Sequence, residues 1–346
     1  LSINDYIFNS CTNLKNITIP NSVINIGDFA FNGCTGLKDI TIPSSVINIG
    51  NNAFADCQNL ENILLSYDRF EDVLTDKSFF GATVGPVAGR IRDASWGEHR
   101  LEKNCGSHHI HGGTKGWSFQ YWEVEVFKTP SSIGVVFYLK DEFSTYPGPI
   151  TATITYRLTK NELEMTTSAS SLVETICNPT NHAYFNLSGN GKRDIYDHQL
   201  TVFLDGLLEL DQEKLPTGNW TKKEDLPIDF RKSPTLQEIL ACYPAGLDDV
   251  FLLHHPRLSR TSLQLFEKHS GRQMTIATSN KSMVLFSTTG FEADFSVNGK
   301  QMHSNYGLAI EPQEIPDIVH FPNFGSINLH PGQERVSQTI YRFSAQ

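Results

Sequence analysis

The sequence has little positive charge and no long hydrophobic run. Its 346 residues include 28 Lys and Arg against 38 Asp and Glu, which gives a formal net charge of −10. Nucleic acids and anionic membranes are bound through clustered Lys and Arg, so this charge argues against both as partners and disfavours a phosphorylated substrate. No apolar stretch approaches the roughly 20 residues of a membrane span, and no signal-peptide pattern opens the chain.

Cofactor motifs and disulfide patterns are also missing. The sequence has no Gly-rich phosphate loop and no CxxC pair. The six cysteines are Cys11, Cys34, Cys57, Cys105, Cys177 and Cys242. Three of them recur at one spacing, which indicates repeat positions and not a disulfide framework. We therefore expect reduced, buried thiols and a cytoplasmic location; export or surface display stays open because the chain starts at Leu1 and not at Met.

Residues 1–65 contain an internal repeat with a period of 23 residues. The repeated positions are Phe8, Phe31 and Phe54, then Cys11, Cys34 and Cys57, then Leu14, Leu37 and Leu60. Apolar residues alternate behind each copy, as in Ile17 and Ile19. The pattern predicts a solenoid in which each unit supplies one short strand and shares a core with its neighbours. The motif CxxLxxIxIPxSVxxIG resembles BspA-like leucine-rich repeats, and this resemblance implies a protein partner for the segment.

From residue 67 onward, short β-prone runs dominate. They span residues 122–127, 133–139, 150–158, 163–168, 200–204, 274–278 and 283–287. Helical periodicity is nearly absent, and residues 235–242 are the one candidate helix. Many short strands with few helices predict a mainly β protein built as an antiparallel sandwich or barrel.

Two polar clusters lie in the first half of this region. Arg90 ends a run of small residues, which suits a tightly packed backbone with one projecting guanidinium; a structural salt bridge is the alternative. The segment 108–111 holds three histidines, and alternation places His109 and His111 on one strand face. No second ligand cluster accompanies them, so we do not predict a metal site. The glycines Gly112 and Gly113 would let a ligand approach the backbone closely.

Two further clusters lie later in the chain. His182 stands among asparagines and aromatic residues in the segment 178–187, as in a sugar pocket where amides bond hydroxyls and rings stack on the sugar. Glu311 follows an apolar strand pattern at Leu308 and Ile310. A carboxyl group beside an apolar element has a raised pKa and can serve as a general base. A structural His182 and an exposed Glu311 are the alternatives.

Together these clusters resemble the aldose 1-epimerase (galactose mutarotase) family over residues 66–346. The matching motifs, in the family's order, are GxxxGRI ending at residue 91, HGG at 111–113, NxTNHxYFNLxG at 178–189, GLDDVF at 246–251, ExQxxPD at 311–317, and LHPG at 329–332 with YRF at 341–343. The resemblance implies a β-supersandwich that follows the short leucine-rich-repeat segment and binds a free monosaccharide without metal or cofactor.

The resemblance also implies a role for each site residue. Glu311 matches the general base that deprotonates the anomeric hydroxyl, and His182 matches the general acid that protonates the ring oxygen. The residues that match positions holding the sugar hydroxyls are Arg90, His111 and Asp248, with Gln313 assisting. The chemistry is consistent with this, because anomer exchange needs one acid and one base at a hemiacetal and moves no electrons.

The sequence departs from the family at several positions. Pro86, Gly89, Asp249 and His320 replace residues that are common there, and we expect these changes to alter sugar preference. The repeats stand where the family has its first strands, so we also expect exposed sheet edges, lower stability and reduced activity.

Two other functions stay open at this stage. A non-catalytic carbohydrate-binding or adhesion module would use the sugar pocket without Glu311 and His182 as catalysts. A glycoside hydrolase would ordinarily need two carboxylates, whereas the motifs provide one carboxylate and one histidine.

Overall fold

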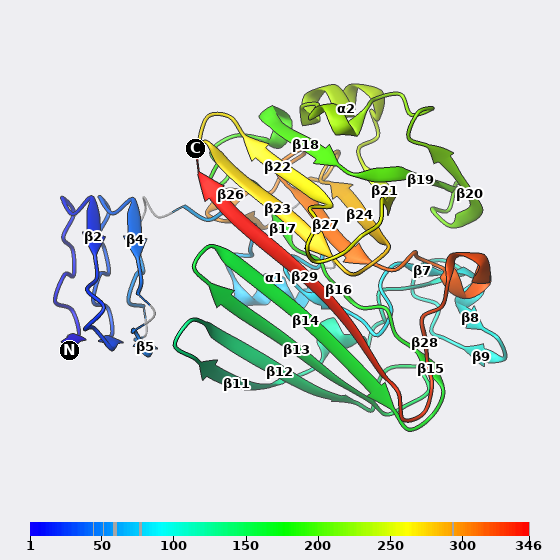
Figure 1. The fold of residues 1–346 in the computed structure, drawn as a ribbon, viewed down its shortest axis with the longest axis horizontal. Coiled ribbons are helices and arrows are strands. Elements are labelled where there is room, and N and C mark those ends of the chain that lie inside the picture. Colours follow the sequence, from blue (N-terminus) through cyan, green and yellow to red (C-terminus); the bar gives the residue numbers. More distant parts are fainter. Residues whose placement is uncertain (44, 51, 58–60, 76–77, 293, 346) are drawn as a thin grey trace. The chain divides into compact units, whose positions relative to one another are not determined.

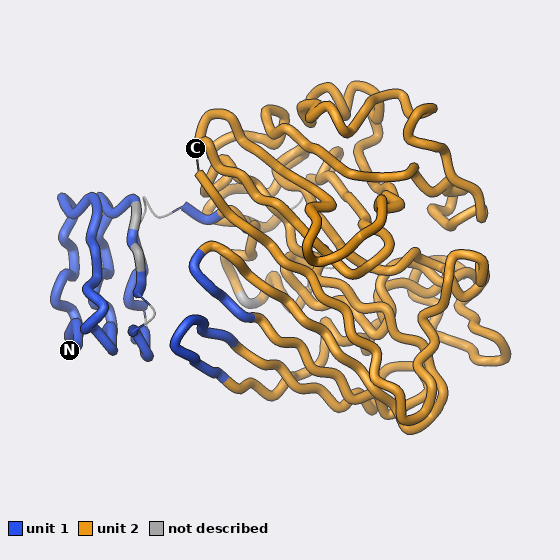
Figure 2. Tube along the Cα trace, viewed as in Figure 1, with its two compact units in different colours: residues 1–62, 126–134, 157–160 blue, residues 63–125, 135–156, 161–346 orange. Residues whose placement is uncertain are grey.

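The computed structural model describes the chain except residues 44, 51, 58–60, 76–77, 293 and 346. The chain forms two compact units (Figure 2). The first comprises residues 1–62, 126–134 and 157–160, and the second comprises residues 63–125, 135–156 and 161–346. Within the described residues, no helix is long and apolar enough to cross a membrane.

The repeat segment forms a solenoid of short parallel strands (Figure 1). One ladder joins β1 (Ser2–Ile3), β3 (Asn25–Ile26) and β5 (Asn48–Ile49), and a second joins β2 (Asn16–Thr18) and β4 (Asp39–Thr41). The prediction of one strand per unit was therefore wrong. The segment that follows each proline, as at Pro20, pairs with its own copy in the next repeat and adds the second ladder.

Repeated side chains stack on one another inside the solenoid. The rings of Phe8, Phe31 and Phe54 lie parallel, with centroids 5.0 and 5.2 Å apart. The Cys34 thiol donates to the Phe8 carbonyl oxygen, and the Cys57 thiol donates to that of Phe31, each at 3.0 Å. The 23-residue period thus becomes a ladder of identical contacts. The third repeated leucine, Leu60, lies outside the described residues.

All six cysteines are free, but they are not all buried. Cys34, Cys57 and Cys177 are buried, Cys11 and Cys105 are half-buried, and Cys242 is exposed at the end of a helix. The expectation of buried thiols is thus wrong for Cys242, because the polar face of a surface helix carries it.

Two antiparallel sheets build the larger part of the chain (Figure 1). The eight-stranded sheet has the order β11 (Glu123–Lys128), β12 (Ile133–Asp141), β13 (Ile150–Thr159), β14 (Glu162–Ser171), β29 (Glu334–Ala345), β23 (Arg272–Thr278), β22 (Leu263–Glu267) and β18 (His198–Val202). The six-stranded sheet has the order β17 (Tyr184–Phe185), β27 (Leu308–Gln313), β24 (Ser282–Ser287), β21 (Asp248–Leu253), β19 (Leu204–Leu210) and β20 (Pro216–Lys222). The predicted mainly β sandwich is confirmed.

The core lies between these two sheets. Leu200 of β18 and Ile276 of β23 belong to the same buried cluster as Leu308 and Ile310 of β27. Burying one such side chain stabilises the fold by about 1.5–3 kcal/mol. The inner faces of the two sheets therefore hold each other in place, and the strands that carry site residues are anchored on this core.

Helices are few among the described residues. The predicted helix is present as α2 (Leu236–Cys242), and Thr235 and Glu238 form a reciprocal capping box at its start. A six-residue helix, α1 (Phe70–Thr75), escaped prediction because it is too short to show a helical period. Single 3₁₀ turns are η1 (Arg92–Ala94), η2 (Trp117–Phe119), η3 (Ile195–Asp197), η4 (Phe230–Lys232), η5 (Ile318–His320) and η6 (Pro322–Phe324).

Short two-stranded ladders tie distant segments together. They pair β6 (Thr83–Val84) with β16 (Thr180–Asn181), β7 (Arg90–Ile91) with β10 (His109–Ile110), β8 (Ser95–Trp96) with β9 (His99–Arg100), β15 (Thr175–Ile176) with β28 (Asn328–Leu329), and β25 (Ser296–Val297) with β26 (Lys300–Gln301). The first two of these ladders bring the segments of three predicted site residues next to each other.

Two sheet edges differ in how far they are covered. Residues 63–65 run beside β17, where Leu64 bridges Phe185. At the edge of the eight-stranded sheet, β11 exposes Val124 and Val126. Exposed apolar edge strands favour association with other chains.

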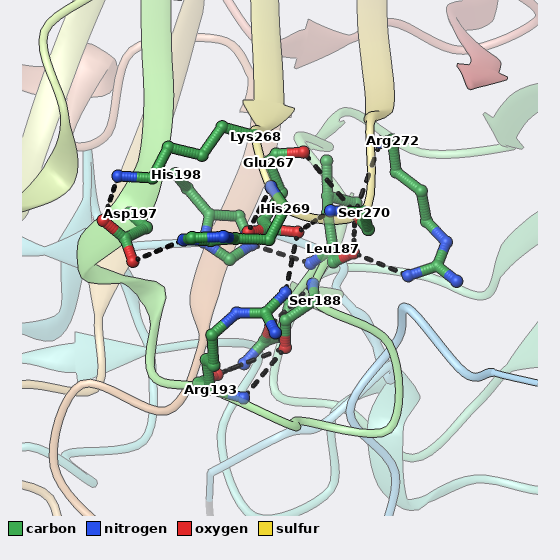
Figure 3. A network of polar contacts seen from close by, with 11 residues as sticks. Leu187, Ser188, Arg193, Asp197, His198, Glu267, Lys268, His269, Ser270 and Arg272 are labelled. Carbon is green, nitrogen blue, oxygen red and sulfur yellow. Dashed lines mark hydrogen bonds and ion pairs between the residues drawn. The ribbon is translucent and has the colours of Figure 1, made fainter. Parts of the chain in front are cut away.

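A buried carboxylate fixes the segment that follows β17 (Figure 3). The Glu267 side chain is 1% exposed; it accepts hydrogen bonds from the amides of Ser270 (2.7 Å) and His269 (3.1 Å) and pairs with Arg193 at 3.1 Å. The Ser270 hydroxyl donates to the carbonyl oxygen of Leu187, whose N–H donates to His198 Nε2 at 2.8 Å. Leu187 is thereby held from both sides, a few residues after His182.

We expect Glu267→Ala to lower the free energy of unfolding by about 3 kcal/mol, because two amides and Arg193 lose a buried acceptor. Urea denaturation followed by circular dichroism measures this loss. As the control, Glu162→Ala removes a carboxylate from the half-exposed pair with Arg342 and should cost less than about 1 kcal/mol. Equal denaturation midpoints for the two variants would contradict the anchoring role.

Candidate active site

One cavity of about 460 Å³ collects the predicted site residues. Those that line it are Arg90, His111, His182, Asp248, Glu311 and Gln313. They come from five separate segments of the chain, and the six-stranded sheet and its flanking ladders bring them together. The two proposed catalytic side chains therefore share one pocket.

Glu311 stands inside a fully buried strand. Every residue of β27 is buried, since the strand pairs with β17 on one side and with β24 on the other. The sequence placed Glu311 at the end of this strand, but pairing with β24 continues to Gln313. Burial, with a smaller contribution from the nearby Asp248 charge, raises the pKa of Glu311 to about 8.

His182 faces Glu311 from the turn between β16 and β17. Its Nε2 lies 3.3 Å from Glu311 Oε1, and both side chains are less than a tenth exposed. Burial lowers the pKa of His182 to about 4. At neutral pH the pair therefore holds one titratable proton between the two side chains.

The asparagines around His182 form hydrogen bonds with other residues of the protein. Asn178 exchanges two hydrogen bonds with the backbone of Glu314, and Asn181 donates to the Gly81 carbonyl and to the Tyr156 hydroxyl oxygen. These asparagines do not line the cavity. The expectation that they bond sugar hydroxyls was wrong. Their hydrogen bonds join the His182 segment to Glu314, directly after β27, and to Gly81.

The neighbouring histidines His109 and His111 have different hydrogen-bond partners. His111 leaves the strand with φ 54° and accepts a hydrogen bond from the Gly89 N–H at 3.3 Å on its Nδ1. His109 instead places Nδ1 2.7 Å from the Glu102 carbonyl oxygen, so the two do not share one face as the alternation predicted. Burial, with the charges of His182 and Arg90, lowers the pKa of His111 well below its usual value. In the described part of the chain, no three His, Cys, Asp or Glu residues are arranged to hold a metal ion.

Gly112 serves the close approach of two backbone segments. It has φ 84°, and a Cβ atom there would lie 1.9 Å from the Gly85 carbonyl oxygen. The cavity itself is lined by the second glycine, Gly113. We expected a ligand to come close to the backbone at this glycine pair. At Gly112 it is another backbone segment, at Gly85, that comes close.

Gln313 and Asp248 complete the polar wall. Both polar atoms of the Gln313 amide are buried, and neither bonds to a described residue. Buried amides are ordinarily hydrogen-bonded, so these two atoms suit the hydroxyls of a ligand.

Asp248 lies 3.8 Å from the ammonium group of Lys214, a cavity residue that sequence reasoning missed. The only signal for Lys214 was its place just before the Pro-Thr-Gly turn.

Several other lining side chains also escaped prediction. The aromatic ones are Phe79, Phe119, Phe286 and Phe291, which join Tyr184. Of the four departures from the family motifs, Gly89 lines the cavity, whereas Pro86, Asp249 and His320 do not. His320 instead places Nδ1 2.7 Å from Asp317 Oδ1, and this contact raises the pKa of His320.

Comparison with known proteins gives consistent results. The aldose 1-epimerase family model matches residues 53–342, and the BspA type leucine rich repeat model matches residues 1–81 in six copies. Galactose mutarotase of Bos taurus is 32% identical over 292 residues, covering 82% of this chain and 84% of the bovine protein. Aldose 1-epimerase of Streptococcus thermophilus is 32% identical over 283 residues, covering 78% and 80%.

A solved structure agrees with this fold. The crystal structure of an aldose epimerase homologue from C. elegans matches with a TM-score of 0.73 and 27% identity, covering 82% of this chain and 88% of that one.

Proposed function

The chain belongs to the aldose 1-epimerase family, and on this premise we propose that it interconverts the α and β anomers of free hexoses such as galactose and glucose through Glu311 and His182. One observation carries the proposal: His182 Nε2 and Glu311 Oε1 lie 3.3 Å apart in one cavity. The two oxygens that must exchange protons are bonded to the same sugar carbon, C1. An acid and a base that serve both oxygens must therefore stand close together.

The proposed reaction begins with a proton moving from Glu311 to His182, which gives a carboxylate and an imidazolium. Glu311 then takes the proton of the C1 hydroxyl while His182 protonates the ring oxygen, and the C1–O5 bond breaks to give the aldehyde. Rotation about C1–C2 turns the other carbonyl face to the O5 hydroxyl. On closure His182 takes the proton of the O5 hydroxyl while Glu311 gives its proton to the carbonyl oxygen, which yields the other anomer and restores the carboxylate and the imidazolium, so protons and electrons balance without a cofactor.

The other polar lining residues are proposed to hold the sugar hydroxyls. Arg90 and His111 offer nitrogen donors, and Asp248 offers a carboxylate. The buried, unbonded amide of Gln313 supports a fourth contact. Fixing the sugar in this way brings C1 to the reacting pair.

Polarimetry tests the proposal directly. Freshly dissolved α-D-galactose or α-D-glucose should approach anomeric equilibrium faster as enzyme is added, in proportion to enzyme concentration. A sugar-binding module would leave the spontaneous rate unchanged, and a glycoside hydrolase would release reducing sugar from a glycoside.

We expect kcat/KM to have a plateau between about pH 4 and about pH 8. Below the His182 pKa both side chains are protonated and the base is lost. Above the Glu311 pKa both have lost the proton and no acid remains. Polarimetry across this range, with the buffer-catalysed rate subtracted, measures the profile; a rate that rises steadily through pH 8 would contradict it.

Three further proposals concern the rest of the chain. We place the boundary between the repeats and the catalytic domain near residue 65, inside the overlap of the two family matches at 53–81. The repeats are proposed to bind another protein. The six free thiols support a cytoplasmic location, while repeats of this kind leave surface display open.

A further inference from the structure

A second cavity of about 660 Å³ adjoins the first. Thr114 and Phe119 line both of them, so the two cavities share a wall. Residues of strands β11, β12 and β13 and of the segments next to them line the second one, and its aromatic residues besides Phe119 are Tyr121, Tyr138 and Phe143. None of these three aromatic residues lines the first cavity.

Aromatic rings stand open to solvent in this second cavity. Tyr121 is 99% exposed, Phe143 66% and Tyr138 40%. Exposed aromatic side chains that lie together in a hollow and do not belong to the core are typical of a binding surface. Tyrosine offers an apolar ring and a polar hydroxyl, which suits a ligand with apolar faces and polar edges.

Polar side chains surround the rings and carry no single sign of charge. They are Thr114, Lys115, Gln120, Glu123, Lys140 and Thr151. Nucleic acids and anionic membranes need clustered positive charge, so this mixed rim does not suit them. Hydrogen-bonding groups beside exposed rings match a carbohydrate, whose rings present C–H faces and hydroxyl edges.

The segment that carries Tyr121 is fixed by buried contacts. Asp141, which is 2% exposed, accepts from Trp117 Nε1 at 2.9 Å and from Gln120 Nε2 at 2.8 Å. Residues 117–121 are thereby tied to the end of β12. The platform is thus held before a ligand arrives, which lowers the entropic cost of binding.

We propose that this second cavity binds the following sugar units of a reducing oligosaccharide whose free anomeric end lies between Glu311 and His182. The inference rests on the proposed function. The shared wall supports it, because a glycosidic bond beside Thr114 and Phe119 would join a ring in each cavity.

The test compares sugars of different length on the full chain. Initial mutarotation rates are measured for galactose, glucose, lactose, maltotriose and cellotriose with the wild type and with the double variant Tyr121→Ala/Phe143→Ala. We expect the double variant to lose about tenfold in kcat/KM for at least one of the oligosaccharides, mainly through a higher KM, because two aromatic contacts with the further sugar units are removed. Rates on galactose and glucose should stay within about twofold, as neither ring lines the first cavity.

Two control variants separate stacking from unfolding. Tyr121→Phe keeps the ring and should retain the oligosaccharide rate, and Leu172→Ala changes an exposed apolar residue outside both cavities. Equal loss for hexoses and oligosaccharides, or no loss for any oligosaccharide, overturns the inference while leaving the proposed function intact.

Binding gives a readout that does not depend on turnover. Calorimetric titration with maltotriose and cellotriose should show a Kd for at least one of them that is about tenfold weaker in the double variant than in the wild type. If no sugar is turned over, the proposed function fails, and titration then decides the inference alone. Equal affinities for wild type and double variant overturn it.

Discussion

Glu311→Gln is expected to lower kcat for hexose mutarotation by about 10²–10⁴-fold, the usual contribution of a general acid or base. Glutamine has nearly the same shape and fits the buried strand, but it cannot take a proton from the C1 hydroxyl. KM should change little, because the sugar-holding groups stay in place. Polarimetric progress curves at saturating galactose measure the loss.

A matched control lies three residues further along the chain. Glu314 is also buried, yet it does not line the cavity. Glu314→Gln should keep kcat within about threefold while making the same chemical change next to the same strand. If Glu311→Gln kept the wild-type rate, or if both variants lost activity equally, Glu311 would not be the base.

The residues that the sequence predicted best are those whose neighbours lie close in the chain. The 23-residue period reports contacts between adjacent copies, so the ladder of Phe8, Phe31 and Phe54 follows from spacing alone. The strand around Glu311 follows from its apolar pattern, and the helix follows from the helical periodicity of residues 235–242. In each case the local pattern and the tertiary environment agree.

The sequence failed where a contact depends on segments far apart. Lys214 reaches Asp248 only because a turn of the six-stranded sheet folds back over the cavity. Tyr121 lines a cavity only because three strands and a loop meet there, and its own pattern is that of an ordinary strand start. The asparagines beside His182 looked like sugar ligands, but the register of β27 sets their partners.

The site has reactive groups that the fold alone would not favour. A carboxyl group and an imidazole that are buried side by side cost stability wherever they are not catalytic. Contacts of Glu267, Ser270 and His198 anchor Leu187, a few residues after His182, and we expect this anchoring to limit movement of the His182 segment. Burial raises the pKa of Glu311 and lowers the pKa of His182. The pair therefore holds one titratable proton throughout the neutral pH range.

His182→Asn is the second change with a large expected effect, a loss of about 10²–10⁴-fold in kcat near neutral pH. Asparagine keeps a hydrogen-bonding side chain but cannot pass a proton to the ring oxygen. The pH profile should change in shape as well as in height. With His182 absent, the remaining rate needs the Glu311 carboxylate, so it should rise as pH passes the raised pKa of Glu311.

The control for this variant is His254→Asn, which removes an exposed imidazole paired with Asp205 away from the cavity. It should keep both the wild-type rate and the wild-type plateau. Polarimetry of the three proteins from about pH 4 to about pH 9 separates the outcomes. A His182→Asn profile that still falls above pH 8 would mean that another group supplies the acid, and the pairing of His182 with Glu311 would no longer explain the reaction.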